Sequence, residues 1–269
     1  MSRNASRVNQ AETLGIPQQQ ATYSPPTTLV NLPSLGKFYP QGHPLYDAET
    51  VEVKPMTTRE EEILTNQSLI EKGLVIDRLI KSVLLDESIE PTSLLIGDRN
   101  AILIALRVDA YGEDYEITVP CPRCTKAQQK VVDLSTLSHS KNHLELDTTE
   151  EGTFVVELPR TGAKLELKMM NGEDEKKVSE ATQKQKKYGL ERPLANQYSQ
   201  MIVSVNGERD LSTISSFASS MPAYDSRFLR KAYKAIVPDV DMSFDFQCED
   251  CGHEQGMEVP ITANFFWSE

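Results

Sequence analysis

Two short cysteine motifs decide the fold of this chain, Cys121-Pro122-Arg123-Cys124 and Cys248-Glu249-Asp250-Cys251. Together they contain all four cysteines, so no thiol is left over. A C-x-x-C pair at a tight turn directs two thiolates to one point, and two such turns supply the tetrahedral four-sulfur set that a structural zinc ion prefers. The predicted ligands of one structural zinc ion per chain are Cys121, Cys124, Cys248 and Cys251.

The residues on either side of both motifs alternate between apolar and polar, as they do in β-strands. Around the first motif the apolar positions are Tyr115, Ile117 and Val119 before it and Val131 and Val132 after it. Around the second motif they are Val240, Met242, Phe244 and Phe246 before it and Met257, Val259 and Ile261 after it. Each half therefore predicts a strand, a knuckle and a strand, and the two halves form a split zinc ribbon.

The knuckles differ at the residue that follows the second cysteine. Gly252 suits a position that requires positive φ, whereas the first motif has Thr125 there. Three other uses of the cysteines remain open, namely a redox dithiol, a disulfide pair and four buried free thiols. A redox C-x-x-C motif opens a helix, which neither motif does. Since four thiolates close the coordination shell, we expect the zinc ion to stabilise the fold and to perform no chemistry.

Composition and charge exclude several classes of protein. The chain has 269 residues, of which 39% are hydrophobic and 25% are charged, as in ordinary globular domains. Its longest apolar run, residues 101–106, is far shorter than the roughly 20 residues of a membrane span, and its polar beginning lacks the apolar region of a signal peptide. We therefore expect no membrane partner and a reducing, cytosol-like compartment, in which structural disulfides are rare. A net charge of -12 would repel a phosphate backbone, so we expect no nucleic-acid partner either.

The remaining sequence predicts an α+β protein, with a small helical unit, the split ribbon, and a long insertion of a hairpin and helices. The first residues are rich in Gln, Ser, Thr and Pro and show no apolar period, which is typical of disorder. The expected parts are a disordered arm at 1–30, an extended docking segment at 31–56, a helical unit at 57–110, the split zinc ribbon at 111–137 and 239–267, and an inserted hairpin with helices at 138–238.

Helical signals begin at Thr57, where Thr57 with Glu60 and Ser68 with Glu71 each have the spacing of a capping box. An apolar stripe at helical spacing follows and is expected in the core. Its members are Ile76, Leu79, Ile80, Val83 and Leu84. A further helix is expected at about 98–108, leading into the first ribbon strand.

The insertion predicts one hairpin, followed by helices. The hairpin has a turn at 160–162, with Phe154, Val156 and Leu158 opposite Leu165, Leu167 and Met169. A polar helix is expected at 173–187, and a second helix carries its apolar period through Val205 and ends at Gly207. Two shorter helices are expected at about 211–218 and 229–236.

Signatures of catalysis are missing from the sequence. It contains no phosphate-binding loop, dinucleotide-binding glycine motif, nucleophile elbow or H-E-x-x-H zinc motif. Its four histidines are His43, His139, His143 and His253. None has the sequence setting of a catalytic base, and we expect the protein not to be an enzyme.

Large aromatic residues are the candidates for partner contact. The proline-rich segment around Phe38 and Tyr39 cannot form a helix, and three aromatics lie together near the end of the sequence, including its only tryptophan. The three terminal rings are expected to be buried either on the ribbon or in a partner, and the proline-rich segment is expected to lie extended across a surface, its own or a neighbour's. The candidate partner-binding residues are Phe38, Tyr39, Phe265, Phe266 and Trp267.

Several sequence strings, in their order along the chain, carry a resemblance to a known family. They are residues 32–40, 54–64, 98–100, 111–112, the Cys121/Cys124 knuckle, residues 225–227, the Cys248/Cys251 knuckle with Gly252, and residues 265–267. In these strings the chain resembles the baseplate hub protein family of T-even-type contractile-tailed phages. The resemblance covers essentially all of the chain except the arm.

This resemblance implies a phage late protein that builds the central hub of the tail baseplate, found in the host cytoplasm during assembly and in the virion tail afterwards. Implied partners are other baseplate, hub or tape-measure proteins, and a homo-oligomer is also compatible with it. It implies no catalytic residue. Two alternatives remain: a transient chaperone of tail assembly, for example for the tape-measure protein, and a zinc-ribbon regulator that binds nucleic acid or polymerase.

Overall fold

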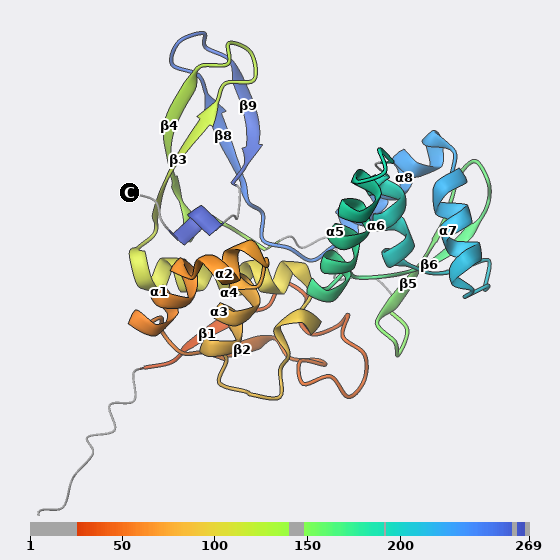
Figure 1. Cartoon of the computed structure of the whole chain (residues 1–269), viewed down its shortest axis with the longest axis horizontal. Helices are drawn as coiled ribbons and strands as arrows, with labels where there is room; N and C mark the ends of the chain where they lie inside the picture. The colour runs from red at the N-terminus through yellow and green to blue at the C-terminus, as the bar shows by residue number, and fades with distance from the viewer. Residues whose placement is uncertain (1–25, 140–147, 191, 260–262, 267–269) are drawn as a thin grey trace, which may run out of the picture.

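The computed structural model describes residues 26–139, 148–190, 192–259 and 263–266. It confirms the predicted α+β class: small antiparallel sheets accompany helices in each part of the molecule. Figure 1 shows a helical unit over a two-stranded sheet, a ribbon of two hairpins that projects from it, and an inserted unit to one side. The predicted fold, with a helical unit, a split ribbon and a hairpin-and-helix insertion, is therefore present.

The N-terminal segment forms a strand pair. Strand β1 (Thr28–Asn31) pairs antiparallel with β2 (Thr50–Val53), and tight turns occupy much of the chain between them. The segment 31–56, which was expected to be extended, is therefore folded back on itself. Val51 and Val53 of β2 are buried in the core. Since β1 begins at Thr28, the chain is ordered before the end of the expected arm; residues 1–25 lie outside the described residues.

The helical unit follows the predicted order with one correction. Its helices are α1 (Thr58–Thr65), α2 (Gln67–Glu71), α3 (Val75–Val83), the short 3-10 turn η1 (Pro91–Ser93) and α4 (Ile96–Tyr111). Thr57 and Glu60 form the expected capping box at α1. The second expected box is wrong, because the Asn66 side chain accepts the amide of Leu69 at 3.2 Å and caps α2 instead.

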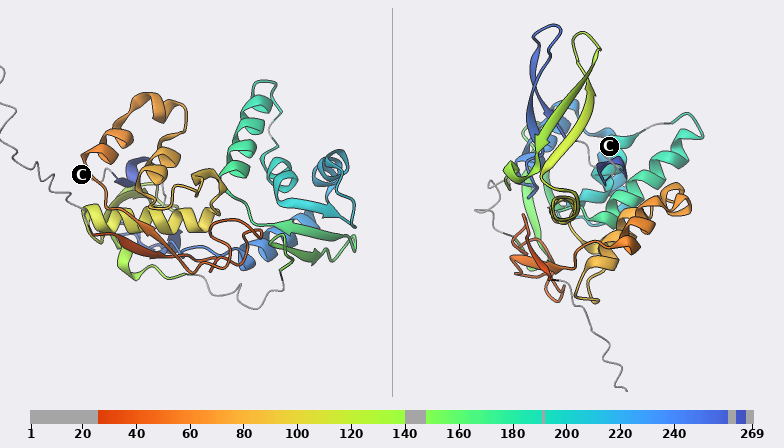
Figure 2. Two further views of the ribbon diagram at one scale, coloured as in Figure 1. Left: turned by 90° about the horizontal axis from the view of Figure 1, so that it is seen from below. Right: turned by 90° about the vertical axis from the view of Figure 1, so that its left-hand side faces the viewer.

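Helix α4 lies at the centre of this unit, as the views of Figure 2 show. Residues from several of its faces are buried, including Ile102 and Leu106, which explains why its sequence has little helical amphipathicity. The helix ends at Gly112, whose φ of 87° turns the chain toward the ribbon. The expected helix at 98–108 is confirmed and extends further at both ends.

Three consecutive residues near the beginning of α4 connect it to three other segments. The buried Asp98 carboxylate accepts hydrogen bonds from Ser34 Oγ at 2.7 Å and Tyr39 OH at 2.8 Å. Arg99 forms an ion pair of 2.8 Å with Asp77 of α3, and Asn100 Nδ2 donates to Asp239 at 3.1 Å. These contacts fix the N-terminal turns, α3 and the chain entering the second ribbon half on one helix.

The ribbon consists of two antiparallel hairpins that lie side by side in Figures 1 and 2. Strand β3 (Asp114–Pro120) pairs with β4 (Ala127–Asp133), and β8 (Ser243–Gln247) pairs with β9 (Glu254–Glu258). The 3-10 turns η2 (Leu134–Thr136) and η3 (Ala263–Phe266) lie near its base. Residues of β3 alternate between buried and exposed as predicted.

The inserted unit contains the predicted hairpin and a strand that the sequence pattern did not indicate. Strands β5 (Thr153–Glu157) and β6 (Lys164–Lys168) form the hairpin, with Phe154 opposite Leu167 and Val156 opposite Leu165. Strand β7 (Ile202–Val205) completes a sheet of order β5-β6-β7. The helices of this unit are α5 (Gly172–Lys186), α6 (Pro193–Met201), α7 (Leu211–Ser220) and α8 (Ala223–Ile236).

The helix expected to continue through Val205 was too long. Helix α6 ends at Met201, and the next residues pair with β6. The apolar period of this segment fits either structure, but β-branched Ile202, Val203 and Val205 favour a strand, and a free sheet edge is available to them. The sequence contained the β-branched signal, but only the neighbouring strand made it decisive.

Candidate metal centre

The two C-x-x-C motifs lie at the tips of the ribbon hairpins, and each makes the same backbone turn. In the first knuckle the amide of Cys121 donates to the carbonyl of Lys126 at 2.9 Å, and Thr125 N donates to Cys121 O at 2.9 Å. In the second, Cys248 N donates to His253 O at 2.9 Å, and Gly252 N to Cys248 O at 3.0 Å. The two turns are therefore equivalent, although their sequences differ.

The residue after the second cysteine has positive φ in both knuckles. Gly252 has φ 67°, as its sequence position indicated, and Thr125 has φ 61°. This conformation is strained for a β-branched residue. The Thr125 hydroxyl donates to the carbonyl of Cys124 at 2.7 Å, which partly offsets the strain. The first knuckle thus keeps the glycine conformation without a glycine.

The four sulfur atoms have the spacing that a tetrahedral metal site requires. The distances Cys121 Sγ to Cys251 Sγ and Cys124 Sγ to Cys248 Sγ are both 3.7 Å, and all four sulfurs lie within 4.8 Å of one another. Zn–S bonds of about 2.3 Å give S···S edges of about 3.8 Å in a tetrahedron. A disulfide bond, at about 2.05 Å, is much shorter. The four thiols are free, fit a zinc ion and could bind one.

The electrostatics of the cluster also favour a cation at its centre. Burial opposes ionisation of Cys121, but backbone amides of Cys124 and Arg123 that point at its sulfur lower its pKa to about 6. At Cys124 the Lys126 amide favours the thiolate, yet burial and the neighbouring sulfurs outweigh it and raise its pKa to about 12. The protein alone thus supports an ionised thiol but not four adjacent thiolates, which a divalent cation would stabilise.

Polar contacts beside the sulfurs connect the two hairpins. The Asp250 carboxylate forms an ion pair with Lys126 and accepts a hydrogen bond of 2.8 Å from Gln128 Nε2. Gln128 Oε1 in turn accepts the backbone amide of Glu249 at 3.2 Å, and Lys130 pairs with Glu249 at 2.7 Å. The knuckles are therefore held at a fixed separation by side chains outside the cysteine cluster.

At the base of the ribbon, Arg107 of α4 binds the end of the described chain. Its guanidinium donates from Nε to the carbonyl of Phe265 at 3.2 Å and from NH1 to that of Gly112 at 3.1 Å. The Phe265 ring packs edge-on against Tyr115 of β3, with 4.9 Å between centroids. Arg107 is buried, so its guanidinium needs these hydrogen-bond partners. Together with the ring contact, its hydrogen bonds join α4, β3 and η3.

The aromatic residues expected at a partner surface are part of the protein's own core. Phe38, Tyr39, Phe265 and Phe266 are each at most 4% exposed. For Phe265 and Phe266, which the sequence left between the ribbon and a partner, the structure shows burial beside the ribbon. These four positions therefore offer no exposed ring to a partner. Trp267 lies outside the described residues.

The histidines do not form a common site among the described residues. His43 stacks on Tyr39 with 4.3 Å between ring centroids, and its Nε2 lies 2.9 Å from Ser93 Oγ. His139 forms an isolated β-bridge with Val240, and His253 continues the second knuckle. His143 lies outside the described residues. Among the described residues, no histidine belongs to the group of side chains that could hold a metal ion, which consists of the four cysteines.

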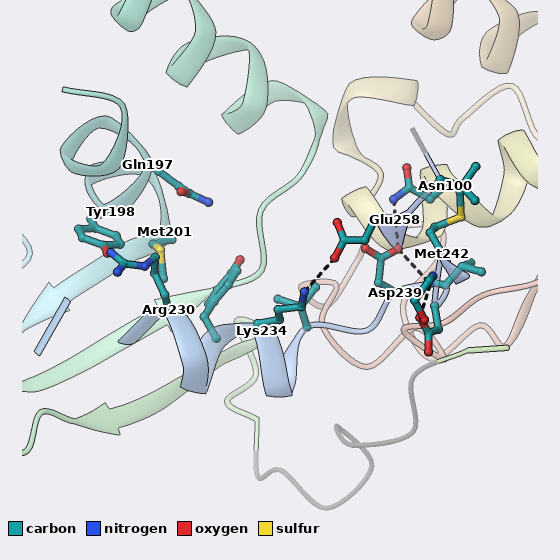
Figure 3. Close-up of a pocket in the computed structure, with 15 residues that line it drawn as sticks. Asn100, Gln197, Tyr198, Met201, Arg230, Lys234, Asp239, Met242 and Glu258 are labelled. Atoms are coloured by element: carbon teal, nitrogen blue, oxygen red, sulfur yellow. Dashed lines mark hydrogen bonds and ion pairs between the residues drawn. The ribbon is translucent and has the colours of Figure 1, made fainter. Parts of the chain in front are cut away.

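Sequence reasoning missed a cleft between the inserted unit and the ribbon base (Figure 3). Its volume is about 810 Å³. Its lining comes from five segments of the chain, α4, α6, α8, the segment before β8, and the end of β9, and includes Met201, Lys234, Asp241 and Glu258. No local motif marks it, because residues far apart in the sequence form its walls.

One comparison with known proteins identifies a family for this chain. The sequence pattern of the family described as T4 bacteriophage base plate protein matches residues 25–267, which include all the described secondary structure. No curated protein and no solved structure matches the chain. Over the described residues, no helix is both long and apolar enough to cross a bilayer. The chain belongs to the T4 bacteriophage base plate protein family.

Proposed function

We propose that the protein is a structural component of the baseplate hub that contacts neighbouring baseplate proteins, and that one zinc ion bound by its four cysteines holds its ribbon together. The observation that carries this proposal is the family match over residues 25–267, because it spans both the ribbon and the inserted unit. A baseplate protein acts through contacts with other baseplate proteins. The hub, as the particular place within the baseplate, rests on the resemblance of the sequence strings.

The geometry supports a structural role for the metal. The four cysteines would hold it as thiolates, and with four protein ligands no coordination position remains for a substrate. The chemistry that zinc supplies here is therefore cross-linking of two hairpins that are far apart in the sequence. We also propose that the protein is not an enzyme, since the family to which it belongs is one of phage baseplate proteins.

Several residues that carry the family resemblance form hydrogen bonds between distant segments of this fold. Ser34 and Tyr39 bind Asp98, and the carboxylate of Asp225 accepts the amides of Arg160 at 2.9 Å and Thr161 at 3.1 Å in the hairpin turn. These contacts join distant segments into a defined shape. A component that positions its neighbours in an assembly needs such a shape, so the contacts support a scaffold role.

The test is quantitative mass spectrometry of purified tails and virions. A structural hub protein is expected at a fixed ratio to other baseplate proteins. Absence from finished particles, combined with failure of tail assembly when the gene is lost, would instead establish a transient assembly chaperone. Salt-dependent DNA binding by the purified protein would favour the regulator alternative, which the net charge of -12 disfavours.

Metal analysis tests the zinc part separately. Protein purified without added zinc is expected to contain about one zinc ion per chain. Protein that lacks metal while all four thiols react freely would contradict the proposed site, whatever its location in the particle.

A further inference from the structure

The cleft between the inserted unit and the ribbon base has features that the zinc ribbon does not explain. Its volume of about 810 Å³ lies within the roughly 300–1,000 Å³ of protein binding pockets. In Figure 3 the side chains of α6 and α8 lie on one side, and those of the ribbon base lie on the other. A ligand in this cleft would therefore contact both units at once.

The lining is partly apolar, and its two methionines lie on opposite walls. Met201 of α6 is buried on one wall, and Met242, just before β8, is half-buried on the other. Val237 and Val259 also line the cleft. Methionine side chains are flexible and polarizable, so they adapt to apolar side chains of different shapes. The cleft can therefore take up an apolar side chain without a single rigid fit.

The charges at the mouth of the cleft are unequal. Lys234 Nζ lies 2.9 Å from Glu258 Oε1, and this pair joins α8 to β9 across the cleft (Figure 3). Asp241 and Asp239 also line the cleft, and these carboxylates, after Glu258, raise the pKa of Lys234. The lining of the ribbon base thus carries three carboxylates, of which Glu258 is paired with Lys234.

The other cation that lines the cleft has partners within the inserted unit. Arg230 NH1 donates to Tyr198 OH at 3.0 Å and to Ser226 Oγ at 2.9 Å. An anionic ligand at the ribbon base would meet the carboxylates of Asp239, Asp241 and Glu258, whereas Arg230 lies on the opposite wall (Figure 3). The lining therefore favours a cation over a phosphate or a carboxylate.

We propose that this cleft binds a segment of another baseplate protein in which a lysine or arginine side chain adjoins an apolar side chain. The incoming cation would lie among Glu258, Asp241 and Asp239, where Lys234 lies in the free chain. Both side chains of the Lys234–Glu258 pair are more than 70% exposed, and such pairs are weak, so the exchange costs little. The apolar neighbour would pack between Met201 and Met242.

This inference rests on the proposed function, because it assumes a partner within the baseplate. It adds where that partner binds and which chemistry it carries. The net charge of -12 fits a basic segment, and a docked segment would fix the angle between the ribbon and the inserted unit.

The test is site-specific photo-crosslinking in infected cells with the full-length chain. A benzophenone amino acid replaces Gln197 in the cleft wall, and a matched control replaces exposed Glu180 on α5. We expect Gln197, but not Glu180, to crosslink to one baseplate protein. Mass spectrometry of the crosslinked peptide should place the bond beside a lysine or arginine.

Charge-reversal variants make the test specific for the carboxylates. The double variant Asp241→Lys, Glu258→Lys should reduce the Gln197 crosslink by about tenfold or more, because like charges would then face the incoming cation. The matched variant Glu116→Lys, Glu254→Lys changes exposed ribbon residues that do not line the cleft and should leave the crosslink unchanged. Zinc content and melting temperature of the purified variants verify that they fold.

The outcomes separate this proposal from the proposed function. Absence of a crosslink, a crosslink only to this chain, a crosslinked segment without a basic residue, or equal effects of the two double variants would each overturn the cleft proposal. If the chain is present in tails at a fixed ratio in such a case, the structural role stands alone. If the chain is absent from tails but the crosslink forms during assembly, the cleft proposal stands and the permanent role fails.

Discussion

The two hairpins of the ribbon share one knuckle geometry but differ in how the rest of the protein supports them. Strands β3 and β4 have seven residues each, and Tyr115, Ile117 and Val119 are all buried. Strands β8 and β9 have five residues each, and Phe246 is the only buried side chain in these two strands. Identical local structure therefore has unequal support: the first hairpin packs on the helical unit, and the second depends more on the first hairpin and the metal.

The largest expected effect comes from removing a ligand on the weakly supported side. Cys248→Ser should abolish stoichiometric zinc binding, because it removes one of the four ligands. The effect should be large, since zinc binding contributes about 10–16 kcal/mol in zinc-finger peptides. Hydrogen exchange should then increase strongly in β8–β9 and less in β3–β4. Chelation of the wild-type metal is the control and should give the same pattern. Equal exchange in both hairpins would contradict the unequal support.

The next effect concerns the core contact at the ribbon base. Phe265→Ala should lower the free energy of unfolding by about 3–5 kcal/mol, because a fully buried ring is replaced by a cavity. Phe244→Ala on β8 is the matched control and should cost less, since that ring is only partly buried. Urea unfolding monitored by circular dichroism measures both. Both proteins should retain zinc, because neither ring lies at the knuckles.

Exchanging the residues at the positive-φ position sharpens the comparison of the two knuckles. Gly252→Thr should cost about 1–2 kcal/mol from backbone strain alone, since a Cβ at this glycine would meet no atom within 4 Å. Thr125→Gly should be stabilising by about 0.5–1 kcal/mol, because relief of strain exceeds the loss of the hydroxyl contact with Cys124. Melting temperatures of the zinc-loaded proteins test both signs. A destabilised Thr125→Gly protein would show that the lost hydroxyl contact, together with the higher entropy of glycine in the unfolded chain, outweighs the relief of strain.

The smallest effect is expected at the contact between the hairpins. Asp250→Asn should accelerate zinc release to a chelator by roughly tenfold or less, because Lys126 loses its partner while the four ligands stay. Hydrogen bonds from Lys126 and Gln128 lower the pKa of Asp250. Its contribution is therefore present above the usual aspartate pKa and is lost as the pH falls through the lowered value. Variant and wild type should therefore differ at neutral pH, where the Asp250 carboxylate is ionised.

Local patterns predicted much of the fold. The C-x-x-C spacing, the alternation around it, the hairpin with Phe154 opposite Leu167, and the capping box at Thr57 all involve neighbours in sequence or within one strand pair. Propensity failed where two structures fit one pattern. Residues 202–205 satisfied a helical period, yet they became β7 because β6 offered an edge to pair with.

Burial of the aromatic residues could not be predicted from the same patterns. Phe38 and Tyr39 lie in a segment without periodicity, so the sequence showed apolar rings without showing what would cover them. The Tyr39 hydroxyl donates to Asp98 in the first turn of α4, 59 residues away. A buried tyrosine needs a hydrogen-bond partner, and that partner was identifiable only in three dimensions.

The sequence by itself determined the four-cysteine set, the strand-knuckle-strand pattern around each pair and the resemblance to baseplate proteins, because each depends on residue identity at short, fixed spacing. Tertiary structure alone decided that the four sulfurs meet within 4.8 Å, that Phe265 and Phe266 pack at the ribbon base, and that Lys234 and Glu258 face each other across a cleft. Those features join segments separated by tens to more than a hundred residues. Contacts at such separation depend on how whole units pack, which no local pattern encodes.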